Sequence, residues 1–245
     1  MVTVRFLGSG DAFGSGGRFN TCIHVAARSA TFLIDCGASS LIAMKRFGVD
    51  AADIGLIVLS HLHGDHFGGI PFLIRETQIA RRREAPLVIV GPPSTEERVH
   101  DATEALFPGA TRQGLSFALK YVTLAPGEPN PIGPLIVTPY PSLHTPGTEA
   151  HALRIEIEGK VIGYSGDTEW TDALTKVAED ADLFISEAYS FDLGVKNHMS
   201  YWTLRERRSS LGCRRLVVTH MNSDMLSGLA DLETEWADDG KTITL

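Results

Sequence analysis

The chain has 245 residues, of which 43% are hydrophobic, and its formal net charge is −8 at pH 7. A chain of this length buries a substantial core, and α/β architectures of this size routinely form one domain. The acidic balance argues against a protein that binds nucleic acid mainly through bulk positive charge. Since no linker divides the sequence, we expect a single domain over residues 1–245.

The sequence offers no sign of a membrane span or an exported protein. No run approaches the roughly 18 apolar residues of a membrane helix, and the first residues lack a charged-then-apolar export segment. The cysteines Cys22, Cys36 and Cys213 are odd in number and lack CxxC spacing, which argues against a disulfide framework or a cysteine-rich zinc site. We therefore expect a soluble protein of the cytoplasm without membrane contact.

Strands and helices are predicted in mixed order along the chain. Strands are expected near residues 2–7, 21–26, 30–35, 55–59, 117–124, 135–138, 182–186 and 215–218, with further strands before residue 164. Helices are expected near residues 39–47, 67–80, 94–106, 170–179 and 201–211. The Pro- and Gly-rich stretch 125–134 lies between two strands and predicts a hairpin-like loop. This mixture favours an α/β fold whose sheets are covered by helices.

The run Ser60-His61-Leu62-His63-Gly64-Asp65-His66 follows the apolar stretch 55–59 and is dense in ionisable groups. Imidazole and carboxylate are natural ligands for zinc and similar ions. Placing so many of these groups at one strand end is costly without a cation to organise them. The run therefore predicts a metal site.

Further ligands are needed, because one loop cannot supply a complete site. Three candidates lie downstream, each just past a stretch rich in β-branched or aromatic residues: His144, Asp167 and His220. Such stretches indicate buried strands whose ends bring side chains to a common edge. These three residues are therefore predicted to join the first cluster.

The ordered pattern His-x-His-x-Asp-His, His, Asp, His resembles the metallo-β-lactamase fold superfamily. The resemblance implies a four-layer αββα sandwich that binds two divalent metal ions, for which zinc is the first candidate and manganese an alternative. By this resemblance, Asp167 would bridge both ions, and Asp35 matches an acid that supports the ligands from behind. The ligand sets would be His61, His63 and His144 for one ion, and Asp65, His66 and His220 for the other.

A second pattern resembles the ribonuclease Z branch of this superfamily. Ser186-Glu187-Ala188-Tyr189 is followed by Asn197-His198-Met199-Ser200, and in that branch a Glu orients a His beside the metal pair. Glu187 and His198 would fill these roles. The opening strand and the Gly-rich loop 8–18 also resemble the branch, and such loops let backbone N–H groups approach phosphate. A Gly cluster after a strand is most often just a turn, which is the alternative interpretation of this loop.

The chemistry of phosphodiester cleavage fits these residues. Two divalent ions roughly 3.5–4 Å apart generate a hydroxide near neutral pH and stabilise both the attacking and the leaving oxygen. We expect a metal-bridging hydroxide to attack phosphorus, with Asp65 positioning the water or accepting its proton. A His held by a carboxylate is a suitable proton donor near pH 7. His198, held by Glu187, is therefore the predicted general acid for the leaving oxygen.

The substrate stays open at this stage. Transfer-RNA-processing members of the branch carry a long Gly/Pro-rich arm, which this chain lacks, so a small or cyclic phosphodiester is favoured over transfer-RNA 3′-end processing. An RNA substrate and a homodimer remain compatible with the resemblance. A metallohydrolase of carboxylic or sulfate esters is the alternative of another class. A non-catalytic binding module is disfavoured, because all seven ligand positions are filled.

Several other residues have no predicted role in the site. Arg75 and the run 81–83 are interpreted as part of a solvated face with mixed charge. His100 is expected to face solvent on a helix, while His24 and His151 are expected on strands. Core packing is the expected use of three aromatic residues near the site, namely Trp170, Tyr189 and Phe191.

Overall fold

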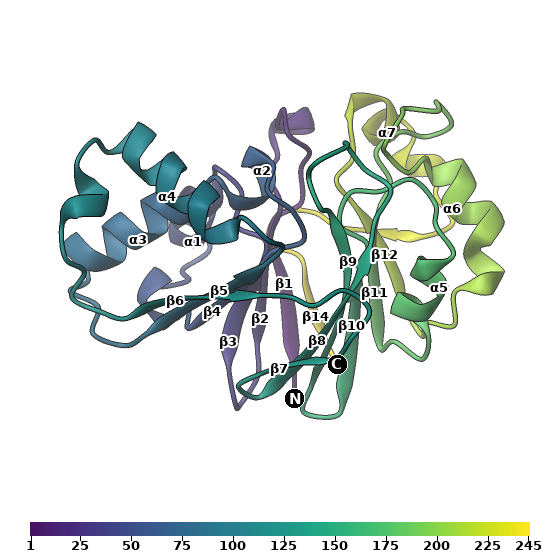
Figure 1. Cartoon of the computed structure of the whole chain (residues 1–245). Coiled ribbons are helices and arrows are strands. Elements are labelled where there is room, and N and C mark those ends of the chain that lie inside the picture. Colours follow the sequence, from purple (N-terminus) through teal and green to yellow (C-terminus); the bar gives the residue numbers. More distant parts are fainter.

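Two seven-stranded sheets pack face to face in the computed structural model, which describes residues 1–245 (Figure 1). The first sheet has the order β14 (Thr242–Thr244), β1 (Thr3–Gly8), β2 (Cys22–Ala26), β3 (Thr31–Ile34), β4 (Leu56–Val58), β5 (Leu87–Gly91) and β6 (Leu119–Thr123). The second has the order β13 (Glu235–Trp236), β12 (Leu216–Thr219), β11 (Leu183–Glu187), β10 (Lys160–Tyr164), β9 (His151–Ile157), β8 (Leu135–Pro141) and β7 (Asn130–Ile132).

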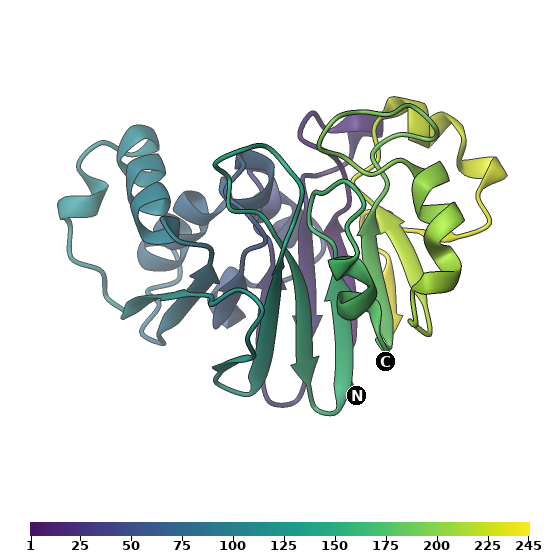
Figure 2. The same cartoon turned by 45° about the vertical axis from the view of Figure 1, so that its right-hand side comes forward.

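Helices cover the outer face of each sheet, and the two views show them at opposite sides of the molecule (Figures 1 and 2). The helices of the first half are α1 (Ser40–Arg46), α2 (Gly64–Phe67), α3 (Ile70–Ile79) and α4 (Thr95–Leu106), and those of the second are α5 (Ala173–Ala178), α6 (Tyr201–Arg207) and α7 (Ser223–Ser227). Short 3-10 turns are η1 (Ser15–Gly17), η2 (Ala51–Asp53), η3 (Ala110–Arg112), η4 (Arg208–Ser210) and η5 (Leu229–Asp231). The predicted four-layer αββα sandwich is thereby confirmed.

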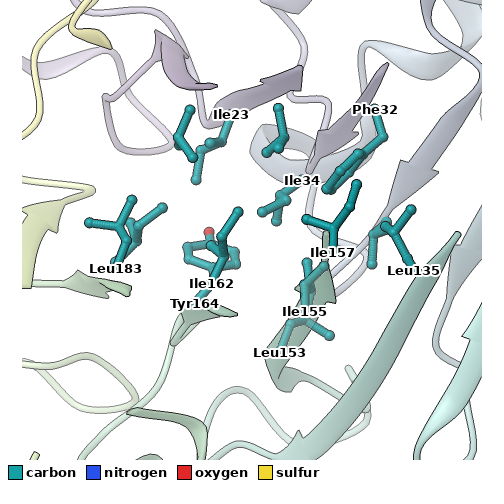
Figure 3. Close-up of a cluster of buried hydrophobic side chains, with 14 of the residues drawn as sticks. Ile23, Phe32, Ile34, Leu135, Leu153, Ile155, Ile157, Ile162, Tyr164 and Leu183 are labelled. Atoms are coloured by element: carbon teal, nitrogen blue, oxygen red, sulfur yellow. The ribbon is translucent and has the colours of Figure 1, made fainter. Parts of the chain in front are cut away.

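The space between the sheets is filled by aliphatic and aromatic side chains (Figure 3). Strand alternation explains which residues enter it, since successive side chains point to opposite faces of a sheet. On β9, Leu153, Ile155 and Ile157 belong to the cluster between the sheets, whereas Ala152 packs under the helices of the second half. The outer face of β9 is mixed, because Arg154 and Glu156 alternate with these apolar residues and are only partly buried.

Parallel strands make up one half of each sheet and bring their carboxyl ends to one edge. Strands β3 to β6 are parallel in the first sheet, and β10 to β13 are parallel in the second. The backbone N–H of His220, just after β12, donates to the carbonyl of Ser9, just after β1, at 3.1 Å. The two edges consequently meet, and this is where the predicted site residues follow their strands.

The element bounds differ from the predictions in a few places. The predicted helix 67–80 is two helices, α2 and α3, separated by Gly68 and Gly69, which are poor helix formers. Helix α5 begins only at Ala173, and α6 gives way to the 3-10 turn η4 after Arg207. The loop predicted at 125–134 contains the short strand β7, which pairs with β8 in a hairpin.

One arginine that was expected at the surface is buried. Arg83 is only 4% exposed, and its guanidinium donates to the carbonyls of Ala52, Ala85 and Pro86. Its assignment to a solvated face was wrong, because a charge count does not show that three free carbonyls converge on one arginine.

None of the helices combines the length and the hydropathy that a bilayer crossing requires.

The core between the sheets should be sensitive to loss of volume. We expect Ile155→Ala to lower the free energy of unfolding by about 2–5 kcal/mol, because the fully buried side chain leaves a cavity. The control is Ile136→Ala on the neighbouring strand, where the side chain is 40% exposed and the expected loss is about 0.5 kcal/mol. Urea unfolding followed by tryptophan fluorescence, at fixed metal concentration, measures both. Equal losses would contradict this account of the core.

Candidate metal centre

The first group of candidate ligands consists of three imidazoles. His61 and His63 follow β4, and His144 follows β8 on the other sheet. His63 Nδ1 lies 3.2 Å from His61 Nε2 and 3.1 Å from His144 Nε2. The three ring nitrogens therefore converge on a small region, and these residues form one of the groups that could hold a metal ion.

The second group contains two carboxylates and two imidazoles: Asp65, His66, Asp167 and His220. His66 Nε2 lies 3.1 Å from Asp65 Oδ2 and 3.3 Å from Asp167 Oδ1. The other oxygen of Asp167 lies 3.3 Å from His220 Nε2 and 3.9 Å from His61 Nε2. Asp167 thus lies between the two groups, as the predicted bridging role requires.

The ring orientation of His66 follows from Asp35. The Asp35 carboxylate is fully buried and accepts a hydrogen bond from His66 Nδ1 at 2.7 Å. A carboxylate is an acceptor only, so Nδ1 carries the proton and Nε2 keeps its lone pair. Asp35 also accepts from the backbone N–H and the hydroxyl of Ser60, each at 2.8 Å. Because Ser60 Oγ donates there, it accepts from His61 Nδ1 at 3.1 Å, which leaves His61 Nε2 free in the same way.

His144 and His220 are held by the same arrangement. His144 Nδ1 donates to the carbonyl of Asn197 at 2.8 Å, and His220 Nδ1 lies 3.2 Å from the hydroxyl of Thr21. A partner on one ring nitrogen determines the tautomer and points the other nitrogen at the ligand position. Four of the five candidate imidazoles therefore present Nε2 to the cluster, and His63 presents Nδ1.

The donor set fits a divalent cation. His66 Nε2 and Asp167 Oδ1 are buried and have no hydrogen-bond partner in the protein. Buried polar atoms in native structures are nearly always paired, and an unpaired one is costly. Imidazole nitrogens and carboxylate oxygens are ligands that zinc and related ions use. A cation bound to these atoms would satisfy both of them.

The backbone is constrained around this cluster. Asp35 and His220 both have φ of 57°, a left-handed conformation that costs energy for a residue with a side chain. Each follows the last residue of a strand, so the strained turn directs the side chain to the edge where the sheets meet. Gly37 is also required, because a Cβ there would lie 2.1 Å from the carbonyl oxygen of Asp65.

Glu187 and His198 lie beside the second group and form, with Asp167 and His220, a third cluster of potential ligands. The Glu187 carboxylate accepts from His198 Nδ1 and from the backbone N–H of Thr168 at 2.9 Å and of Met199 at 3.2 Å. Burial lowers the pKa of His198, but the hydrogen bond and the charge of Glu187 outweigh it and raise this pKa above its ordinary value. The predicted pair is thus in contact.

Tyr189 was expected to pack in the core, but it lies beside the candidate site. Its ring stacks on His198, with centroids 4.5 Å apart, and lies 6.1 Å from the ring of His220. By contrast, Trp170 and Phe191 pack against the buried cluster of the second half. The available signal was the position of Tyr189, two residues after Glu187 at the end of β11, which carries it to the same edge.

The Gly-rich loop 8–18 reaches this edge from the first sheet. A Cβ on Gly8 would lie 1.9 Å from the carbonyl oxygen of Asn20, so close packing within the loop already accounts for this glycine. Arg18 donates to the carbonyl of Ala237 at 2.7 Å and ties the loop to the segment before β14. These contacts favour the turn interpretation, and a role in phosphate contact stays a prediction.

All seven residues predicted as metal ligands lie in the two adjacent groups, and Asp35, Glu187 and His198 contact or adjoin them. Their assignment as ligands and catalytic groups stays a prediction. The sequence did not reveal the groups that contact the Nδ1 atoms of the candidate ligand histidines, which are Ser60, Thr21 and the Asn197 carbonyl.

Two facing sheets with a His/Asp cluster at their shared edge define a metal-dependent hydrolase of the metallo-β-lactamase fold, in its ribonuclease Z-like branch. Within that class, residues 2–231 match the sequence profile of the anti-Pycsar protein Apyc1, and the chain belongs to this family. The predicted superfamily and branch are confirmed.

Comparisons with individual proteins agree with this placement. The chain is 28% identical to the ribonuclease Z of Methanothermobacter thermautotrophicus over 91% of its own length and 87% of that protein. It is 30% identical to the ribonuclease Z of Mycobacterium tuberculosis over 90% and 85%. The crystal structure of the short form of human tRNase Z superposes with a TM-score of 0.79 at 23% identity, covering 99% of this chain and 98% of that one. A diphosphatase of the PhnP family has a TM-score of 0.81 at 18% identity, with coverage of 100% and 98%.

The Asp35 carboxylate should control metal affinity. In Asp35→Asn, the amide NH2 would face donor groups, which favours the tautomer of His66 whose Nε2 carries the proton and cannot bind metal. We expect metal affinity to fall about 10- to 100-fold, measured by competition with a chromogenic chelator. The matched control is Tyr164→Phe, which removes a different hydrogen bond to Asp35, of 3.0 Å, and should leave metal affinity near that of the wild type. Unchanged affinity in Asp35→Asn would refute this role.

Proposed function

We propose that the protein hydrolyses a small or cyclic phosphodiester, with His61, His63, Asp65, His66, His144, Asp167 and His220 holding two divalent ions. The observation that carries this proposal is the Glu187–His198 pair beside the ligand cluster. When bound, the ions would supply positive charge to the phosphate and lower the pKa of a water molecule. Zinc suits the ligands best, and manganese is the alternative.

His198 is suited to protonate the leaving oxygen. Its Nδ1 is held by Glu187, and its ring is backed by Tyr189, so Nε2 has a defined direction. The side chain is 21% exposed, which leaves the imidazole accessible from the mouth of the site. A donor whose orientation and protonation are both supported by a buried carboxylate is an effective general acid near neutral pH.

Asp65 has the complementary role toward the attacking water. Its Oδ2 lies 3.1 Å from His66 Nε2, and its side chain is 9% exposed. This placement allows the carboxylate to orient a water molecule or to accept its proton while it remains one of the proposed ligands. The two catalytic side chains therefore approach the substrate from different loops.

The segment between His66 and His144 and the cavity beside His198 favour a small substrate. The segment between His66 and His144 is occupied by α3, α4 and strands β5 to β8, without a long projecting arm. A cavity of about 400 Å³ adjoins His198 and is lined by Trp170 and Lys196, among others. A cavity of this size is typical of small-ligand sites.

Transfer-RNA 3′-end processing is the second candidate, because relatives named ribonuclease Z match about nine tenths of the chain. Hydrolysis of carboxylic or sulfate esters on the same ligand set is the alternative of another class. A homodimer remains a prediction from the sequence.

A substrate panel separates these functions. We expect protein loaded with zinc or manganese to hydrolyse bis-p-nitrophenyl phosphate, and to prefer 2′,3′- or 3′,5′-cyclic nucleotides to a 3′-extended precursor transfer RNA. A chelator should abolish turnover, and readdition of metal should restore it. Efficient cutting of the precursor would favour the transfer-RNA alternative. Absence of all phosphodiester turnover with either metal would overturn the proposal and redirect the search to carboxylic and sulfate esters.

His198→Ala should separate proton donation from metal binding. We expect kcat on an alkoxide-leaving diester to fall about 10²- to 10⁴-fold, because the leaving oxygen loses its proton donor. The loss on bis-p-nitrophenyl phosphate should be smaller, since p-nitrophenolate leaves without protonation. Metal content should stay at the wild-type level. His100→Ala on the exposed face of α4 is the control. Full turnover of the alkoxide-leaving substrate by the metal-loaded variant would remove His198 from this role.

A further inference from the structure

The segment between β13 and β14 crosses from the second sheet to the first (Figure 1). Within it, the carboxylate of Asp239 accepts three hydrogen bonds. One oxygen accepts from the backbone N–H and from the hydroxyl of Ser9, each at 2.9 Å. The other oxygen accepts from the backbone N–H of Phe19 at 2.9 Å. Asp239 therefore joins the start of the Gly-rich loop 8–18 to the residue that follows its end.

Ser9 lies between Asp239 and the candidate ligand His220. Its hydroxyl donates to Asp239, whereas its carbonyl accepts from the backbone N–H of His220 at 3.1 Å and from the hydroxyl of Thr219 at 3.3 Å. Ser9 is fully buried. Because a closely packed interior transmits strain, a displacement of Ser9 would also displace the backbone of His220.

The other end of the loop leads to the imidazole of His220. Thr21 follows Phe19 by two positions, and its hydroxyl lies 3.2 Å from His220 Nδ1. The Phe19 carbonyl accepts from the backbone N–H of Gly10 at 2.8 Å, which closes the loop on itself. His220 has a strained φ of 57°, so its orientation depends on the contacts that hold this turn. The contacts that Asp239 makes thus support both the backbone and the ring of His220.

The groups around the Asp239 carboxylate require an acceptor. All of its loop partners are donors, and a carboxylate accepts from each of them, whereas an Asn amide would place its NH2 against at least one donor. Hydrogen bonds to a charged acceptor are also stronger than neutral ones. The neighbouring Asp238 is different, because its side chain is 66% exposed and pairs with Arg18 at 3.4 Å.

We propose that Asp239 is a positioning residue for the metal centre and holds His220 in place through Ser9 and the loop 8–18. Asp239 lies outside residues 2–231, the part of the chain that matches the family profile, so its contacts are not part of the matched pattern. The inference rests on the proposed function in one respect, because it requires His220 to be a metal ligand. The Gly-rich loop then acts as a support for that ligand.

Metal affinity of the full chain tests this role, measured by competition with a chromogenic chelator. In Asp239→Asn, we expect the affinity for one of the two ions to fall about 3- to 10-fold, the effect of one hydrogen bond, while the other ion binds as in the wild type. The matched control is Asp238→Asn, which removes the same charge at an exposed position and should leave both affinities unchanged. Ser9→Ala removes the hydroxyl that donates to Asp239 and should weaken the same ion.

A spectroscopic measurement separates positioning from a loss of stability. The visible spectrum of Co²⁺-loaded protein depends on the geometry of the ligands. It should change in Asp239→Asn and stay unchanged in Asp238→Asn, with circular dichroism showing that both variants are folded. Equal weakening of both ions, or wild-type affinity and spectrum in Asp239→Asn and Ser9→Ala, would overturn the inference.

Turnover of bis-p-nitrophenyl phosphate by the wild type reports separately on the phosphodiesterase function. Two bound ions and a selective loss in Asp239→Asn, without any turnover, would contradict that function and leave the role of Asp239 intact. Turnover by the wild type, together with unchanged metal binding in Asp239→Asn, would have the opposite meaning. A wild-type protein that binds fewer than two ions would overturn the ligand set and the positioning role together.

Discussion

The buried carboxylate of Asp35 is the interaction on which the candidate site depends. It accepts hydrogen bonds from the Ser60 backbone, the Ser60 hydroxyl, His66 and the Tyr164 hydroxyl. These donors come from the loop after β4 and from β10, so one side chain joins both sheets to the ligand loop. A buried charge is tolerated only when it is paired or fully hydrogen-bonded, and here every partner is a donor. The left-handed turn at Asp35 is the local conformational cost of this arrangement.

Glu187 accepts a similar set of hydrogen bonds in the second sheet. Like Asp35, it is a fully buried carboxylate at a strand end, bonded to backbone N–H groups and to the Nδ1 of one histidine. The two histidines differ in surroundings: His66 faces two carboxylates inside the ligand cluster, whereas His198 lies nearer the solvent. The same support therefore lies behind a candidate metal ligand in one case and behind the proposed proton donor in the other.

Much of this arrangement could be predicted because it follows from strand ends. A His or Asp directly after an apolar run marks the edge of a sheet, and this rule located His144, Asp167 and His220 without knowledge of their contacts. The short strands β13 and β14 were not predicted, since two or three residues carry too little periodicity. Arg83 and Tyr189 were misjudged for another reason, as their environment is made by residues distant in sequence, such as Ala52 and His220.

The pairing of β1 with β14 has a practical consequence. Thr3 lies opposite Thr244, so both chain ends are neighbours at the end of the first sheet away from the ligand cluster (Figure 1). A surface, dye or reporter domain attached at either end is held on the far side of the molecule from the mouth of the site. Such a tether fixes the orientation of the protein without obstructing diffusion of small molecules into the site. A linker that joins the two chain ends would need to span only a short distance.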